Sequence, residues 1–175
     1  VFSSERSYTD IDKRATYLKT EYNTSVENYN NACKHSTHDW VCVLTDDLHL
    51  TKDPREFIDN CEDTHVFNLH PINTTHTLGS IAGPAIYIPM LHKKIINEQL
   101  DGNIFSAAFK HHFVDLWLGI YLTLKIPNFK IIHKPCIKDV NSAINRDHDE
   151  HDKELWEEIR EKVTNKDPNY TYNGL

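Results

Sequence analysis

A short apolar run that ends in two acids constrains the fold of this chain more than any other feature. Residues 40–44, Trp-Val-Cys-Val-Leu, are followed by Thr45 and then by Asp46 and Asp47. A run so short and so rich in β-branched residues predicts a buried parallel strand in an α/β sheet. Ligands bind at the carboxyl ends of such strands, where a cation or a ligand hydroxyl group would neutralise adjacent carboxylates. The alternative is a solvated acidic turn, because Asp is a common turn residue.

The composition indicates a single soluble globular domain. The 175 residues are 39% hydrophobic and 10% aromatic, which is sufficient for a packed core. Lys and Arg number 19 and Asp and Glu number 26, so the net charge is −7 and no basic stripe is present. Nucleic acid is therefore not expected as a partner. The longest apolar runs, such as residues 81–91, contain proline and are far shorter than the roughly 20 residues of a membrane span, so none is expected in this chain.

The cysteines and the glycosylation sequons favour different compartments. The four cysteines show no short spacing such as CxxC, and Cys42 lies inside the predicted buried strand. We therefore expect reduced thiols and a cytoplasmic location. Three sequons begin at Asn23, Asn73 and Asn169, and they would matter in a secretory lumen. That location, and an N-terminal targeting or anchoring segment removed before Val1, remain the alternatives.

Predicted strands and helices alternate along the chain, which favours an α/β fold with a mostly parallel sheet. Helical spacing predicts a helix over residues 25–38, and Pro54 in a first turn predicts one that continues to Cys61. Further strands are expected over residues 64–69, 85–89 and 129–133, and further helices over residues 91–100 and 153–163. One domain is expected over residues 1–164, followed by a polar tail over residues 165–175.

Two further features carry candidate chemistry. Gly79 and Gly83, in the loop before the strand at 85–89, let the backbone approach a ligand closely. Asp115 lies within the strongly apolar stretch 109–124, so burial is expected to raise the pKa of its carboxyl. A raised pKa suits a general base that acts near neutral pH. The alternative is that Asp115 caps the helix that follows it.

The order of these parts resembles that of the nucleotide-sugar-dependent glycosyltransferases of the GT-A fold, most closely the inverting family-2 type. The resemblance spans roughly residues 22–134 and includes a helix with Asn30-Asn31-Ala32, the strand that ends in acids, the glycine loop and the later Asp. It implies a single-domain, Rossmann-like and mostly parallel sheet flanked by helices. This chain departs from the family in that the first strand-helix unit, which holds part of the nucleotide base, is expected to be missing before Val1. It also implies a metal-dependent transferase that moves a sugar from a nucleotide-sugar donor to a saccharide or other hydroxyl acceptor with inversion.

The resemblance assigns roles to individual residues. In that family the acidic motif binds a divalent cation on the nucleotide diphosphate and contacts the ribose. By similarity Asp46 faces the ribose or uracil side, and Asp47 is a ligand of Mn²⁺ or Mg²⁺, hard cations that prefer oxygen ligands. Gly79 and Gly83 belong to the nucleotide-sugar site. Asp115 corresponds to the catalytic base of inverting members.

Histidines supply further candidate metal ligands. In an alternative register, Asp47-Leu48-His49 resembles the D-x-H variant of related transferases, in which the His is also a ligand. Related folds often recruit a late histidine, for which we rank His148 first, then His151, then His133. The pair His111-His112 lies beside Asp115 in the sequence, where an imidazole would contact an acceptor sugar or satisfy the buried acid.

Two departures from the family and two rival functions stay open. Thr45 stands where the acidic motif usually has Asp, and Tyr29 stands where an Arg commonly precedes the Asn of the helix. A nucleotidyltransferase also uses paired carboxylates with Mg²⁺, although the glycine-rich basic loop typical of such enzymes is not visible. The second rival is a catalytically inactive sugar- or nucleotide-binding module, in which Trp40 and Trp117 serve as core or as sugar-stacking surfaces.

Overall fold

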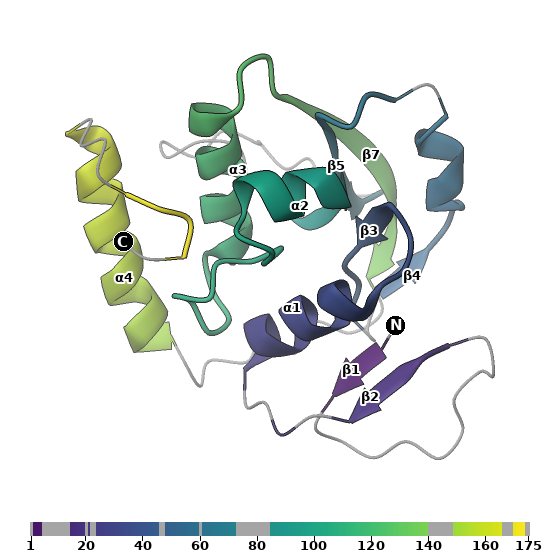
Figure 1. Cartoon of the computed structure of the whole chain (residues 1–175), viewed down its shortest axis with the longest axis horizontal. Helices are drawn as coiled ribbons and strands as arrows, with labels where there is room; N and C mark the ends of the chain where they lie inside the picture. Colours follow the sequence, from purple (N-terminus) through teal and green to yellow (C-terminus); the bar gives the residue numbers. More distant parts are fainter. Residues whose placement is uncertain are drawn as a thin grey trace.

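The computed structural model describes most of the chain, with its helices gathered around one main sheet (Figure 1). The described residues are 2–4, 15–19, 21, 24–45, 48–59, 61–72, 85–139, 149–165 and 170–173. Five of the expected site residues lie outside these ranges, namely Asp46, Asp47, Gly79, Gly83 and His148, as do the sequon residues Asn23, Asn73 and Asn169. His49 and Asp115 lie inside them, as do the lower-ranked candidate ligands His133 and His151.

Among the described residues, five strands form the main sheet in the order β3-β6-β5-β7-β4. The strands are β3 (Trp40–Cys42), β4 (Leu48–Leu50), β5 (His65–Pro71), β6 (Ile88–His92) and β7 (Lys130–Asp139). β5 and β7 are parallel, whereas the β3-β6, β5-β6 and β4-β7 pairs are antiparallel. The prediction of an α/β fold is confirmed, but the prediction of a mostly parallel sheet is wrong.

The connections between strands explain the antiparallel pairs. Residues 43–47 join β3 to β4, whereas a parallel crossover needs a dozen residues or more. A connection of this length cannot cross back to the end of the sheet where β3 begins. β4 therefore starts at the end of the sheet where β3 stops, and it runs in the opposite direction. The connection from β5 to β6, residues 72–87, is long enough for a crossover, but β6 begins beside the end of β5, where Leu69 lies opposite Ile88, and so it too is antiparallel. Sequence periodicity detects strands but does not show at which end of the sheet each strand starts.

The helices follow local sequence signals. They are α1 (Ser25–His35), α2 (Lys93–Gln99), α3 (Val114–Lys125), α4 (Asp149–Thr164) and a short 3₁₀ helix, η1 (Pro54–Phe57). Thr24 Oγ1 accepts a hydrogen bond from Glu27 N at 3.2 Å and so caps α1. The helices expected over 25–38, 91–100 and 153–163 are confirmed in outline, whereas the one at Pro54 ends well before Cys61. In the part of the chain that the structure describes, no helix has both the length and the apolar composition that crossing a membrane requires.

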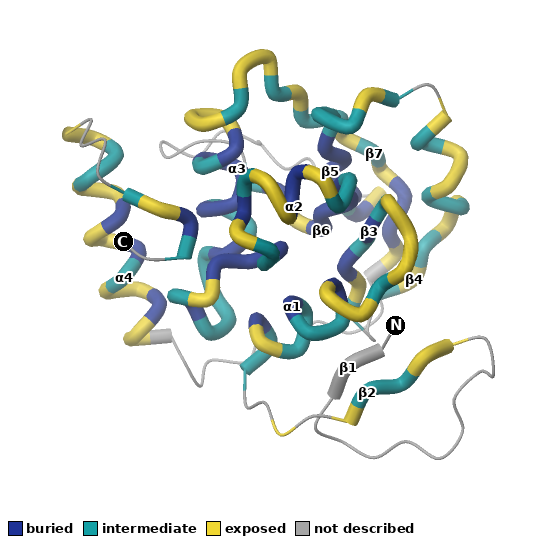
Figure 2. The backbone as a smooth tube through the Cα atoms, in the orientation of Figure 1, coloured by how far each residue is buried: buried dark blue, intermediate teal, exposed yellow. Residues whose placement is uncertain are grey.

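Two apolar clusters lie on the two faces of the main sheet. Figure 2 shows that the buried residues are spread over both the strands and the helices that face them. Successive side chains of a strand point to opposite faces, so Val41 and Val43 join the larger cluster while Trp40 and Cys42 pack against the smaller one. All four long helices contribute to the larger cluster, and η1 packs against the smaller one. A second, two-stranded parallel sheet pairs β1 (Phe2–Ser4) with β2 (Tyr17–Lys19).

The cysteines are free thiols, as predicted. Cys33 belongs to the larger cluster, whereas Cys42, Cys61 and Cys136 lie in or against the smaller one. Burial raises the pKa of the Cys33 thiol to about 11 and that of Cys42 to about 12. Both thiols therefore stay protonated near neutral pH and behave as small apolar side chains.

The segment Tyr170–Asn173 packs into the larger cluster, although the sequence predicts a polar tail there. Tyr172 is fully buried, and its hydroxyl donates to Ile104 O at 2.8 Å. Trp117 Nε1 donates to Tyr172 O at 3.2 Å. The end of the described chain is thus fixed to α3 and to the loop after α2 by two buried hydrogen bonds.

Replacing Tyr172 with Phe is expected to lower the free energy of unfolding by about 1–2 kcal/mol, because the Ile104 carbonyl loses its buried donor. Tyr170→Phe is the matched control, since Tyr170 is only partly buried, and it is expected to change stability by less than about 0.5 kcal/mol. Urea unfolding of the two variants measures both values. Equal losses would contradict a specific role for the Tyr172 hydroxyl.

Candidate functional site

Three strands of the main sheet run toward the same end of the sheet, which is where the sequence predicts a ligand. β6 is antiparallel to both β3 and β5, and β7 is parallel to β5, so β3, β5 and β7 all run in the same direction. Asp46 and Asp47 lie outside the described residues, but the residues on either side of them are joined by a hydrogen bond from Leu48 N to Thr45 O at 3.3 Å. After β3 the chain therefore leads into the acid pair at the end of the sheet toward which these three strands run.

The residues just after the glycine loop are fastened from two sides. The side chain of Asn68, in the middle of β5, donates through Nδ2 to Ala85 O at 3.1 Å and accepts through Oδ1 from Tyr87 N at 2.8 Å. Between these two residues, Ile86 N donates to the backbone carbonyl oxygen of Asp115 at 3.1 Å. The segment Ala85–Tyr87 therefore ties the start of α3 to the centre of the sheet.

Asp115 is partly buried in the first turn of α3. Burial raises the pKa of its carboxyl, while backbone N–H groups of Leu116 and of Asp115 itself, and the charge of His112, act in the opposite direction. The balance is a raised pKa, as expected for a general base. The alternative that Asp115 is the N-cap is wrong, because Phe113 holds that position in a left-handed conformation and no side chain caps the helix there.

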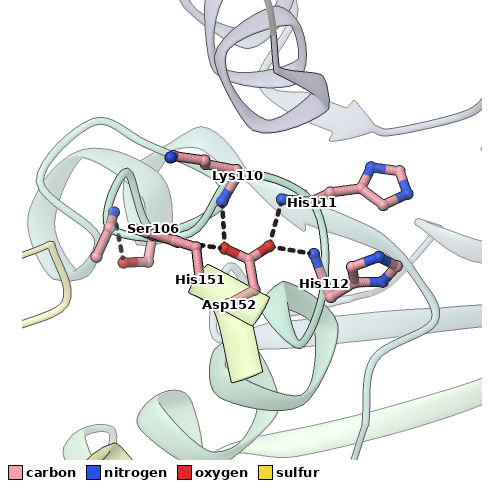
Figure 3. A network of polar contacts seen from close by, with 7 residues as sticks. Ser106, Lys110, His111, His112, His151 and Asp152 are labelled. Carbon is pink, nitrogen blue, oxygen red and sulfur yellow. Dashed lines mark hydrogen bonds and ion pairs between the residues drawn. The ribbon is translucent and has the colours of Figure 1, made fainter. Parts of the chain in front are cut away.

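The loop before α3 is held by one buried carboxylate, Asp152 of α4 (Figure 3). Its two oxygens accept hydrogen bonds from the backbone N–H groups of Lys110 at 2.9 Å, His111 at 2.7 Å and His112 at 2.7 Å. His151 Nδ1 lies 2.9 Å from Asp152 Oδ1. Burial raises the pKa of Asp152, but the hydrogen bonds from His151 and the three backbone groups outweigh it, so the pKa is lowered. The carboxylate therefore stays ionised and fixes the backbone three residues before Asp115.

The histidines near Asp115 take separate roles. His111 Nδ1 lies 2.7 Å from Ser25 Oγ, which ties this loop to α1. The rings of His111 and His112 are perpendicular, with centroids 4.6 Å apart. His112 favours the ionised form of Asp115. Of the two roles expected for this pair, the effect of His112 on the pKa of Asp115 supports an electrostatic interaction with the acid.

The candidate metal ligands are only partly placed. His49 is exposed on β4, and its partner across the strand pair is Lys138. A cation directly opposite does not favour a metal ion at that imidazole. Within the described ranges, no three His, Cys, Asp or Glu side chains converge on a possible metal position. His151 is already bonded to Asp152. The carboxylates Asp46 and Asp47 remain the donor set that fits Mn²⁺ or Mg²⁺.

No protein-family model, curated protein or solved structure matches this chain. The residues and contacts of the chain itself therefore carry the functional argument.

Two buried polar residues of this region are not anticipated from the sequence. Asn68 is fully buried within the apolar strand Val66–Leu69, and that interruption of an apolar run was its only signal. Asp152 precedes Trp156 and Ile159 by four and seven residues, so helical spacing places it on the buried face of α4. The dense charge around it hides this pattern.

Asp152→Asn is expected to lower the free energy of unfolding by about 2–3 kcal/mol at neutral pH, because an amide cannot accept all the hydrogen bonds of the carboxylate. A lowered pKa means that this stability is present above the ordinary value of 3.8 and is lost as pH falls through the folded-state pKa. Urea unfolding of the wild type and variant at neutral and acidic pH measures the difference. Glu154→Gln, an exposed change on the same helix, is the control, and an equal effect there would contradict the prediction.

Proposed function

We propose that this chain is a metal-dependent, inverting glycosyltransferase that uses a nucleotide-sugar donor and a hydroxyl acceptor. One observation carries the proposal: the strand before the acid pair, the segment after the glycine loop and the start of α3 are bonded to one another. Val43 N donates to Pro89 O at 3.1 Å, and Ile86 N donates to Asp115 O at 3.1 Å. Ile86 and Pro89 are three residues apart, a span of about 10 Å in extended chain. Features far apart in the sequence therefore share one region.

The acid pair would serve the donor. Asp46 would face the ribose, and Asp47 would hold Mn²⁺ or Mg²⁺ with the diphosphate. A divalent cation at these carboxylates would neutralise negative charge on the leaving nucleotide diphosphate. Gly79 and Gly83 would let the backbone lie close to the donor, since they carry no side chain.

Asp115 would serve the acceptor. Its raised pKa suits a carboxylate that takes the proton of an acceptor hydroxyl as the oxygen attacks the anomeric carbon. The new bond to that carbon forms as its bond to the diphosphate oxygen breaks on the opposite face, so the configuration inverts. Asp152 and Ile86 would act only by positioning, because both bond the backbone around Asp115.

A thermal-shift panel of UDP-, GDP-, CDP- and dTDP-sugars, each with and without Mn²⁺, tests the donor site. One nucleotide is expected to raise the melting temperature in a metal-dependent manner, because a ligand that binds the folded state stabilises it. Asp47→Ala is expected to abolish that shift, whereas Asp59→Ala, at an exposed acid of the same half of the chain, is expected to keep it. Unchanged nucleotide binding in Asp47→Ala would remove Asp47 from the site. Release of pyrophosphate from a nucleoside triphosphate in the presence of a sugar phosphate would mark a nucleotidyltransferase, and binding of a nucleotide-sugar without turnover would mark an inactive module.

Asp115→Asn is expected to leave donor affinity unchanged and to lower turnover by roughly 10²-fold or more. Because the folded-state pKa is raised, Asp115 contributes stability below its ordinary value of 3.8 and loses it as pH rises through the folded-state pKa. Asn does not titrate, so the variant is expected to gain stability relative to wild type as pH rises toward neutral. Donor turnover and urea unfolding measure the two effects, with exposed Asp39→Asn as the control. Wild-type turnover in Asp115→Asn would contradict the role of general base.

A further inference from the structure

Three polar side chains of β5 and β7 gather on the helix-covered face of the sheet. Asn68 and His70 are two residues apart on β5 and so face the same side, and His133 lies directly opposite Asn68 on β7. Asn68 Nδ2 lies 3.2 Å from His133 Nδ1, and the rings of His70 and His133 have centroids 6.3 Å apart at an angle of 61°. The two imidazoles therefore form a pair beside a buried amide.

The amide fixes the proton of His133. Tyr87 N can only donate, so the atom of Asn68 that receives it must be Oδ1, and the amino group must face Ala85 O and His133. His133 Nδ1 therefore accepts from Asn68, which leaves the ring proton on Nε2. Burial and the nearby His70 lower the pKa of His133, which favours this neutral form. His133 is exposed, so a donor Nε2–H is available at the surface.

His70 has the opposite arrangement. Its Nδ1 lies 3.1 Å from Pro71 O, and a carbonyl oxygen can only accept, so Nδ1 carries the proton. In the tautomer that this contact favours, Nε2 carries the lone pair. His70 is half-buried and lies on the same face as His133, so the pair offers one donor and one acceptor.

This combination selects a class of ligand. A metal ion needs lone pairs, and Nε2 of His133 presents a proton. The oxygens of an ionised phosphate or carboxylate only accept, and Nε2 of His70 presents a lone pair in the tautomer that its contact with Pro71 O favours. A hydroxyl group both donates and accepts, so it complements the two rings. The Nε2–H of His133 would donate to the hydroxyl oxygen, and the hydroxyl proton would be donated to His70 Nε2.

A series of hydrogen bonds connects the histidine pair to the backbone of Asp115. Asn68 bonds the residues on both sides of Ile86, and Ile86 N bonds Asp115 O. Hydrogen bonds across the sheet also connect Asn68 to the chain just before the acid pair. Asn68 lies opposite Pro89, and the carbonyl of Pro89 accepts a hydrogen bond from Val43 N. A ligand on the histidine pair would thus lie between the regions of acceptor activation and donor binding.

We propose that His70 and His133 bind a hydroxyl group of a saccharide or polyol acceptor, next to the hydroxyl that reacts at Asp115. This inference rests on the proposed transferase function for the identity of the ligand as an acceptor. Neither ring is assigned a proton-transfer step. Asn68 is a positioning residue, because it acts through the ring of His133.

Long-range ¹H–¹⁵N NMR of histidine-labelled protein, recorded about one pH unit above the ordinary imidazole pKa of 6.5, tests the pair. We expect the proton of His133 on Nε2 and that of His70 on Nδ1. Methyl glucoside, methyl galactoside, methyl mannoside and glycerol, each added to roughly 100 mM, are the probes. At least one is expected to move the Nε2 resonances of both rings along one saturation curve. His70→Ala or His133→Ala is expected to weaken that binding about tenfold, whereas exposed His38→Ala is expected to leave it unchanged.

Each other result overturns part of the argument. A proton on Nδ1 of His133, or Nε2 resonances that no probe moves, would overturn the proposed hydroxyl site. If the thermal-shift panel shows nucleotide binding while the glycosides leave both rings unmoved, the donor site stands and the hydroxyl site fails. If a glycoside binds the pair but no nucleotide-sugar stabilises the protein, the hydroxyl site stands and the transferase function fails.

Discussion

The buried amide of Asn68 is the contact on which the arrangement of this site depends. A buried amide that lacks partners costs free energy, so its hydrogen bonds must be made in the folded state. Asn68 makes them with Ala85 O, Tyr87 N and His133 Nδ1. These three bonds place the chain ahead of β6 against β5, bring Ile86 to Asp115, and orient the ring of His133. One side chain thus couples the path of the backbone to the chemistry at its surface.

Asp152 positions a second part of the site by the same means, which is hydrogen bonding between a buried side chain and the backbone. Three backbone N–H groups in the loop before α3 have no helical partners, and the buried carboxylate of α4 accepts all three. Apolar packing alone tolerates small shifts, whereas a set of directional hydrogen bonds in a low-dielectric interior fixes one geometry. The start of α3 is therefore positioned by Asn68 from the sheet, through Ile86, and by Asp152 from the last helix.

Sequence reasoning recovers what depends on neighbouring residues and misses what depends on distant ones. A strand before Asp46, the helical spacing of α1 and the partial burial of Asp115 follow from local pattern, and the structure contains each. The prediction that this strand is a buried parallel one is wrong, because β3 lies at the edge of the sheet and pairs antiparallel with β6. Strand order does not follow, because the direction of β4 and β6 is set by where the chain re-enters the sheet. Asn68 and Asp152 were missed for a related reason. Most of their partners are backbone groups, which no residue type reveals.

The pKa values of Asp115 and Asp152 are shifted in opposite directions by their surroundings, although both acids meet the same short stretch of chain. Asp152 is fully buried, yet four hydrogen-bond donors hold its pKa down, so its carboxylate is ionised near neutral pH and serves the structure. Asp115 has fewer opposing interactions, so burial prevails and its pKa is raised. Paired acids whose environments separate their pKa values are typical of sites in which one acid exchanges a proton. The opposite shifts of the two pKa values thus follow from how many hydrogen-bond donors each carboxylate meets, and the raised pKa of Asp115 supports its proposed role as the general base.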